Sequence, residues 1–159
     1  MSESELRDGA AVRFPPPLVP LIALAGGLVI QRVVWPLPFP VEGLARTVAG
    51  GVLLVGGVGL IMAAGRLFQK SGQDPKPWES TPEIIATGIY RLTRNPMYLG
   101  MGLLQAGIGV LLSNLWIVVL VPVSWGVIQR IAIRHEEAYL ERKFGTSYTQ
   151  YKASVRRWL

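Results

Sequence analysis

The sequence predicts an all-α integral membrane protein with about four transmembrane helices, a C-terminal helical hairpin and amphipathic cytoplasmic tail helices. Half of the 159 residues are hydrophobic and only 16% are charged, whereas about a quarter of a soluble domain is charged. The hydrophobic residues also occur in long blocks. A chain of this length forms one domain, which we divide into an N-terminal part (residues 1–68) and a C-terminal part (residues 69–159).

The first two hydrophobic segments run from Leu18 to Val34 and from Thr47 to Phe68. A spanning helix needs about 20 residues, which the second segment reaches easily and the first only marginally. The polar N-terminus lacks the basic region of a signal peptide, so we expect the first segment to remain in the mature protein. Glycines recur through the second segment, in AGGVLLVGGVGLIMAAG. They favour close helix packing over a glycine-lined cofactor groove.

The third segment, Pro96 to Leu112, and the fourth, Leu115 to Ile128, are separated only by Ser113 and Asn114. This spacing predicts a tight helical hairpin. Its tip must lie at an interface or pack on protein, because backbone polar groups need partners. At about 1.5 Å per residue, positions 17 residues before and after the tip return to the same depth.

Two further stretches lie outside the hydrophobic blocks. The connection over residues 69–87 contains three prolines, so we expect an irregular loop that either covers a functional site or is disordered. The tail from Ile131 to Leu159 has a helical pattern. Gly145 is expected to end one helix, and Thr146 to cap a second over residues 147–158.

The charge distribution predicts the orientation in the membrane. Of the 16 lysines and arginines, only Arg32 and Arg46 fall in the first connection. If the chain crosses the membrane four times, all the other lysines and arginines lie on one side of the membrane. Because basic loops stay inside the cell, both termini are predicted to be cytoplasmic. The same placement favours a membrane over nucleic acid as the partner of this basic chain.

Composition also excludes some chemistry. There is no cysteine, and His135 is the single histidine. Thiolate catalysis is therefore excluded, and a lone histidine cannot form a histidine metal site. We expect no metal in the mechanism.

Two polar clusters stand at the cytoplasmic ends of the hairpin. One precedes and opens the third segment, and the other follows the fourth; their members are Tyr90, Arg91, Arg94, Asn95 and Tyr98, and Arg130, Arg134, Glu136 and Glu137. The hairpin brings both clusters to the same depth. They are either interfacial anchors and salt bridges or the walls of a ligand pocket. The mixture of arginine, asparagine, tyrosine and paired acids suits a ligand that carries an amine, hydroxyls and a carboxylate.

The motifs TGIYRLTRNPMYLG (residues 87–100) and RHEEAYLERKFGTSYTQYKASVRRW (residues 134–158) resemble the isoprenylcysteine carboxyl methyltransferase and phospholipid methyltransferase superfamily. The resemblance covers about residues 68–158. It implies an integral membrane methyltransferase that uses S-adenosylmethionine and acts on a membrane lipid or another lipid-like or small-molecule acceptor.

The resemblance also implies roles for individual residues. The cofactor would be bound by residues of the connection, the first motif and the acidic pair, namely Gln73, Ile84, Ile85, Tyr90, Arg94, Asn95, Pro96, Tyr98, Gly100, Glu136 and Glu137. Arg130 or Arg134 would assist the acceptor. Methyl transfer from a sulfonium requires alignment more than acid–base groups, and tyrosine faces can stabilise the cation.

The acceptor stays open at this stage. The isoprenylcysteine enzymes usually have histidine where this chain has Asn95, and Asn-Pro-Met-Tyr-x-Gly looks more like the phosphatidylethanolamine enzymes. The Phe-Gly-x-x-Tyr-x-x-Tyr tail resembles the isoprenylcysteine branch. Two other functions also stay open: a nicotinamide-dependent membrane reductase of the sterol-reductase type, and a non-enzymatic four-helix membrane protein or transporter.

Overall fold

A computed structural model describes residues 9–159, and these residues form helices and no strand. The N-terminal residues 1–8, which include Arg7 of the predicted charge asymmetry, lie outside the described part. The helices are α1 (Leu18–Val29), α2 (Gly43–Lys70), α3 (Pro96–Leu111), α4 (Leu115–Ile128), α5 (Arg134–Phe144) and α6 (Thr146–Ser154). A π-helical turn, Ile30–Val34, continues α1, and a second one, Gln129–Ile133, joins α4 to α5; a 3₁₀ turn, Gly88–Arg91, precedes α3.

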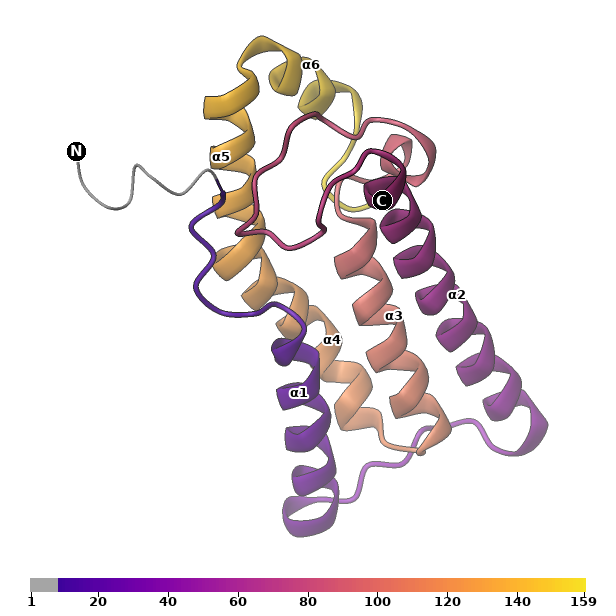
Figure 1. Cartoon of the computed structure of the whole chain (residues 1–159). Helices are drawn as coiled ribbons and strands as arrows, with labels where there is room; N and C mark the ends of the chain where they lie inside the picture. Colours follow the sequence, from indigo (N-terminus) through magenta and orange to yellow (C-terminus); the bar gives the residue numbers. More distant parts are fainter. Residues whose placement is uncertain (1–8) are drawn as a thin grey trace.

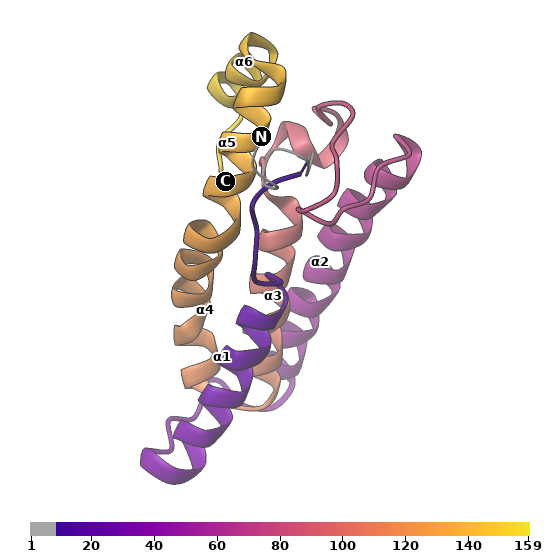
Figure 2. The same ribbon diagram turned by 60° about the vertical axis from the view of Figure 1, so that its left-hand side comes forward.

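The long helices stand side by side in the order α2, α3, α4, α1 (Figure 1). Helix α3 packs on α2 and on α4, and α4 also packs on α1. Helices α5 and α6 extend beyond the start of α3 (Figures 1 and 2). This end of the bundle also carries the connection between α2 and α3, the segment before α1 and the C-terminus.

Helices α2 and α3 approach closely because glycines face one another. Gly50, Gly57 and Ala64 are the buried residues of α2 and recur every seven positions. A Cβ added to Gly57 would lie 2.8 Å from the carbonyl oxygen of Gly100, and one added to Gly107 would lie 2.9 Å from that of Gly50. The glycine segment is therefore a packing surface, which confirms that interpretation of the sequence.

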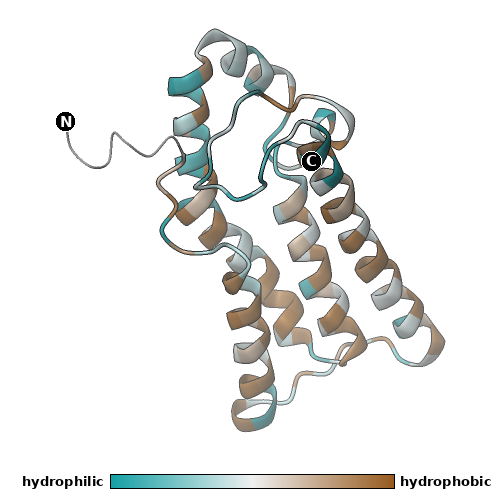
Figure 3. Cartoon of the chain, viewed as in Figure 1, coloured by the Kyte–Doolittle hydropathy of each residue, from teal (hydrophilic) through white to brown (hydrophobic). Residues whose placement is uncertain are grey.

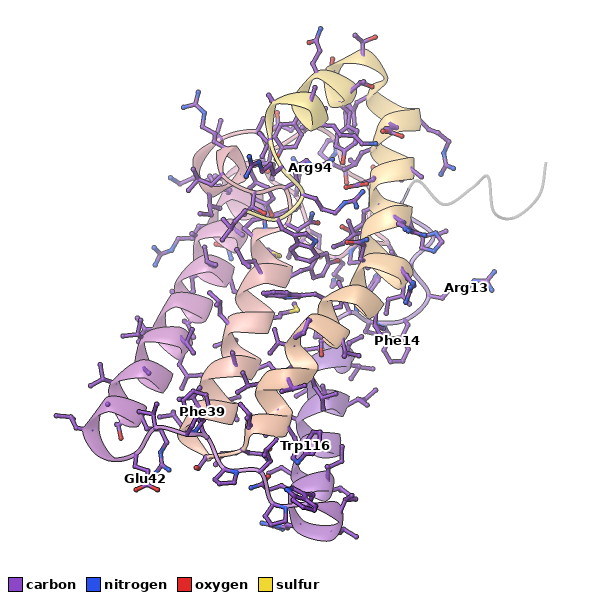
Figure 4. All side chains as sticks on the ribbon, turned by 180° about the vertical axis from the view of Figure 1, so that it is seen from behind. Arg13, Phe14, Phe39, Glu42, Arg94 and Trp116 are labelled. Carbon is purple, nitrogen blue, oxygen red and sulfur yellow. The ribbon has the colours of Figure 1, made fainter. Side chains whose placement is uncertain are left out.

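The predicted hairpin is present, and its tip is packed on protein. Ser113 has a φ of 51°, and its Oγ accepts a hydrogen bond of 3.2 Å from the backbone N–H of Phe39. Figure 4 labels Phe39 at this end of the bundle. Asn114 is buried, accepts from the Ile117 N–H at 3.3 Å and donates to the Gly27 carbonyl at 3.0 Å. The turn thereby finds partners for its polar groups.

Two helices are long and apolar enough to cross a membrane: Gly43–Lys70, and the continuous helix Leu115–Phe144 formed by α4 and α5. Leu18–Val34 and Pro96–Leu111 are shorter apolar helices. Hydrophobic residues cover the long helices, and hydrophilic ones gather at the end with α5 (Figure 3). The outer face of α2 exposes Leu44, Val52 and Val55, as expected of a surface that faces lipid. Four crossings and the orientation of the termini stay predictions.

The segment boundaries differ from the prediction in small ways. Helix α2 begins at Gly43 rather than Thr47 and ends at Lys70 rather than Phe68. The fourth segment does not end at Ile128, since the π-helical turn carries the helix on into α5. The break at Gly145 is where the sequence places it, with a φ of 52° that glycine accepts without strain.

The glycine contact gives a matched test. Gly57→Ala should lower the unfolding temperature in detergent, because its Cβ meets backbone that cannot yield, at a cost of about 1–3 kcal/mol. Gly59→Ala lies in the same helix with nothing within 4 Å of the added Cβ. It should leave the unfolding temperature unchanged or raise it, since alanine favours the helix by about 1 kcal/mol. Equal effects of the two substitutions would contradict the packing described here.

Candidate functional site

A cavity of about 350 Å³ lies at the end of the bundle where α3 begins and α5 rises above it. Its size falls within the range of small-molecule sites, about 300–1,000 Å³. Helices α3, α5 and α6, the connection after α2 and the segment before α1 all contribute to its walls. The cavity is thus built from segments that are far apart in the sequence.

The two helices of the hairpin meet at the cavity through Tyr98 and Glu136. The Tyr98 hydroxyl donates a hydrogen bond to Oε1 of Glu136, and both residues line the cavity. Tyr98 lies near the start of α3 and Glu136 in the first turn of α5. The hairpin therefore brings the two polar clusters together, as its turn length predicts.

Glu137 has a different environment from its neighbour, because two arginines share its carboxylate. Arg157 donates from Nε to Oε1 at 2.9 Å and from Nη2 to Oε2 at 2.7 Å. Nη1 of Arg94 lies 3.2 Å from Oε1. The bidentate geometry of the Arg157 pair is the strong form of this interaction. Glu137 thus connects α5 to the motif before α3 and to the C-terminal segment.

The C-terminal segment after α6 also binds that motif through its backbone. The Arg157 carbonyl accepts from Asn95 Nδ2 at 2.9 Å and from Thr93 Oγ1 at 3.1 Å. The Arg94 N–H donates to the Arg156 carbonyl at 3.0 Å. Since the amide nitrogen of Asn95 is engaged in this way, its side-chain carbonyl oxygen is the group left for a ligand.

A tryptophan pair fixes the same segment to the long helix. The rings of Trp158 and Trp125 lie 5.5 Å apart, and Trp158 Nε1 donates to Gln129 Oε1 at 3.3 Å. Trp125 Nε1 in turn donates to the Tyr98 carbonyl at 3.1 Å. The C-terminus is therefore held at both the cavity wall and α4.

Tyrosines supply an aromatic, uncharged part of the wall. The Tyr151 hydroxyl donates to the Tyr90 carbonyl at 2.8 Å, and Tyr90 packs edge-on against Phe68 with ring centroids 6.1 Å apart. Burial raises the pKa of the Tyr90 hydroxyl, and it raises the pKa of Tyr148 to about 12. Both hydroxyls are therefore protonated at neutral pH.

The connection after α2 has a defined path over the cavity. Gln73 is buried and donates from Nε2 to the Glu83 carbonyl at 3.2 Å. The Thr81 N–H donates to the Tyr139 hydroxyl at 3.2 Å, which ties the connection to α5. The Ala10 N–H donates to the Pro77 carbonyl at 3.0 Å. The sequence left two possibilities for this loop, a covering element or a disordered segment, and in the structure it covers the cavity.

Most residues expected to bind a cofactor line the cavity: Gln73, Ile84, Ile85, Tyr90, Arg94, Asn95, Pro96, Tyr98, Glu136 and Glu137. Gly100 does not line it, because it lies at the α2–α3 crossing instead. Arg130 and Arg134 are exposed and are also absent from the lining. Arg134 precedes Glu136 by two positions, which turns it about 200° around the helix.

Sequence reasoning missed Arg157, together with the C-terminal segment that carries it. Its only sequence signal is the arginine pair at positions 156 and 157, which is typical of a basic tail on lipid. Within the described residues, no group of histidine, aspartate and glutamate is arranged to hold a metal ion.

Comparison with known proteins places this chain in a family. The family model for phospholipid methyltransferases matches residues 45–147, and the chain belongs to that family. The match includes the connection after α2, helix α3 and the acidic pair of α5, which together form much of the cavity wall. No solved structure gives a significant match.

Two relatives are similar over shorter stretches. An uncharacterized protein of Haemophilus influenzae is 42% identical over 65 residues, which are 40% of this chain and 100% of that protein. The protein-S-isoprenylcysteine O-methyltransferase of Saccharomyces cerevisiae is 37% identical over 78 residues, 48% of this chain. The matched stretch is only 32% of the yeast enzyme's length.

The Glu137 cluster predicts a large difference between two glutamates of α5. Glu137→Gln leaves two arginines beside a neutral amide, so it should destabilise the fold by about 3 kcal/mol, the lower end for a broken buried pair. Glu141→Gln is the control, because its partner Lys152 and Glu141 itself are 37% and 40% exposed. Glu141→Gln should lower the free energy of unfolding by about 0–1 kcal/mol. Thermal unfolding in detergent measures both, and similar losses would contradict the structural role of Glu137.

Proposed function

We propose that this protein is an S-adenosylmethionine-dependent membrane methyltransferase that acts on a lipid-like acceptor. Membership of the phospholipid methyltransferase family supports the reaction, and so does the similarity to the yeast O-methyltransferase. The observation that carries the proposal is the covered cavity in which Tyr98 and Glu136 meet at the end of an apolar bundle. It offers a polar, aromatic site next to lipid.

The cavity wall suits this cofactor, which combines a sulfonium, an amino-acid group and a nucleoside. Aromatic faces such as that of Tyr90 attract a cation that has been removed from water. Glu136 offers a carboxylate oxygen to an ammonium or a hydroxyl group, and Asn95 offers its carbonyl oxygen. Pro96 and the Ile84–Ile85 pair provide apolar surface.

The proposed chemistry asks the protein mainly for alignment. When bound, the cofactor would supply a methyl group activated by its positive sulfur. The residues of the wall hold the reactants in line, and this alignment lowers the reaction barrier far more than a general base would here. The connection tied to Tyr139 and Ala10 forms part of the cavity wall, and displacing water from the cavity on binding would strengthen the electrostatic interactions inside it.

This function is favoured over the reductase and transporter alternatives, because the family match names a methyltransferase. The decisive test is binding. Calorimetry on the purified protein should show binding of S-adenosylmethionine and none of reduced nicotinamide dinucleotide. Glu136→Ala should weaken binding by about 10- to 100-fold, the equivalent of a lost charge-assisted hydrogen bond of about 1.5–3 kcal/mol.

Glu141→Ala is the control for that experiment, since Glu141 is not part of the cavity wall. It should bind the cofactor like the wild type. An unchanged affinity in Glu136→Ala would remove Glu136 from the site, and a wild-type protein that binds only the nicotinamide cofactor would reject the proposed function.

The acceptor is expected to be lipid-like because the cavity continues into apolar surface. Met97, Met101 and Leu140 line it, and Met97 and Met101 lie on consecutive turns of α3. Both an amine of a phospholipid and the carboxylate of a prenylated cysteine fit this description. Arg130 and Arg134 are exposed beside the cavity rather than within it, which suits contact with a lipid head group at the membrane surface.

A panel of acceptors with labelled S-adenosylmethionine distinguishes these cases. Ethanolamine lipids, prenylcysteine, fatty acids and small thiols would be compared in detergent or lipid discs. We expect methyl transfer to a lipid-like acceptor of the panel. Met101→Glu should reduce this transfer, because it places a charge on the apolar wall of the cavity. Arg130→Gln and Arg134→Gln should change the apparent acceptor affinity and leave the cofactor affinity unchanged. Transfer only to water-soluble thiols would overturn the lipid assignment.

A further inference from the structure

Arg94 is a buried arginine with two side-chain nitrogens that lack a hydrogen-bond partner. Its side chain is only 9% exposed and lines the cavity. Among residues 9–159, no hydrogen-bond partner is found for its Nε or its Nη1. Figure 4 labels it where α3, α5 and the C-terminal segment converge. Buried donors are nearly always paired, so these two nitrogens indicate an acceptor that belongs to a ligand.

Glu137 is not the missing acceptor for Arg94, because the carboxylate of Glu137 is already bound by Arg157. Both oxygens of Glu137 accept hydrogen bonds from Arg157. Arg94 contacts the same carboxylate at 3.2 Å, but its Nη1 does not make a hydrogen bond there. Two guanidinium groups therefore share one carboxylate. The cluster keeps one uncompensated positive charge, and Arg94 is the arginine of the two that lines the cavity.

We propose that Arg94 is the carboxylate-binding group of the cavity and that Arg157 keeps it available by holding Glu137. The inference rests on the proposed function, and it fixes which end of the cofactor lies here. S-adenosylmethionine carries a carboxylate and an ammonium on one carbon. Arg94 suits the first, since guanidinium groups bind carboxylates in a planar fork. Glu136 lines the same cavity and suits the second.

The alternative is that Arg94 only stabilises the fold through Glu137. Arg157 already pairs with Glu137 in the stronger geometry, so a purely structural Arg94 would be buried with two donors left unused. Such an arrangement is costly for a charged group. A ligand carboxylate on the Nε edge of Arg94 removes this cost for Nε, while Nη1 stays beside Oε1 of Glu137.

The experiment compares two cofactor forms that differ only in the carboxylate. Dissociation constants are measured by calorimetry for S-adenosylmethionine and decarboxylated S-adenosylmethionine. The wild type should prefer the carboxylated form by about tenfold or more, as expected of a charge-assisted pair. Arg94→Gln should reduce this preference to near unity. If that variant is not monodisperse, Arg94→Lys takes its place, and a reduced preference is again expected because lysine lacks the fork.

The role of Arg157 is tested by loss and rescue. In Arg157→Gln, Glu137 is free to pair with Arg94, so the preference should fall towards that of Arg94→Gln. In the double variant Glu137→Gln with Arg157→Gln, the competing carboxylate is gone, and the preference should return. Loss of packing alone cannot produce such a rescue. Arg142→Gln, an exposed change on α5, is the control and should keep the full preference.

The outcomes distinguish a failure of the proposed function from a failure of the carboxylate site. A wild type that binds neither form overturns the proposed function and this inference with it. A wild type that binds both forms equally leaves the proposed function standing and overturns the carboxylate site. A preference that survives in Arg94→Gln or Arg94→Lys also overturns it. A preference that falls in Arg157→Gln and is not restored in the double variant overturns the role of Arg157.

Discussion

A single carboxylate, shared by two arginines, connects three segments that meet at the cavity. Glu137 belongs to α5, Arg94 to the motif before α3, and Arg157 to the C-terminal segment. Without that ion cluster, the C-terminal segment would be held to the motif by neutral hydrogen bonds alone, among them those of the Arg157 carbonyl with Asn95 and Thr93. The carboxylate of Glu137 adds the charged contact to these bonds.

The convergence of the motif with the acidic pair could be predicted from the sequence, because it follows from local rules. A two-residue turn makes antiparallel neighbours, and the rise of the helix fixes which positions share a depth. Glycine spacing likewise predicts the close contact of α2 and α3. Arg157 could not be predicted in this way. Its position depends on how the chain returns after α6, and an arginine pair near a terminus looks the same whether it binds lipid or a buried carboxylate.

Three of the expected site residues lie outside the cavity lining, and this follows from what a motif leaves undetermined. Gly100 stands in the motif beside cavity residues, but it lies two positions after Tyr98, which turns it about 200° around the helix, to the face that meets α2. Arg130 and Arg134 precede the acidic pair, but the helix turns them to its outer side. A motif gives order along the chain, whereas the direction of a side chain depends on helix phase. The π-helical turn at Gln129–Ile133 alters that phase between α4 and α5, at the position where the apolar helix becomes polar. Such turns are frequent at functional sites.

The location of the cavity reconciles two opposed demands on a membrane methyltransferase. A charged cofactor needs polar partners, and a lipid-like acceptor needs apolar surface. Here the polar partners come from the ends of α3 and α5, while Met97 and Met101 continue the wall towards the bundle. The covering connection lies on the side away from the bundle and is held by hydrogen bonds to Tyr139 and Ala10. Because its residues are largely exposed, the connection is the part of the wall that can open at the least cost. A polar cofactor would then exchange on that side, and the apolar side would remain open to lipid.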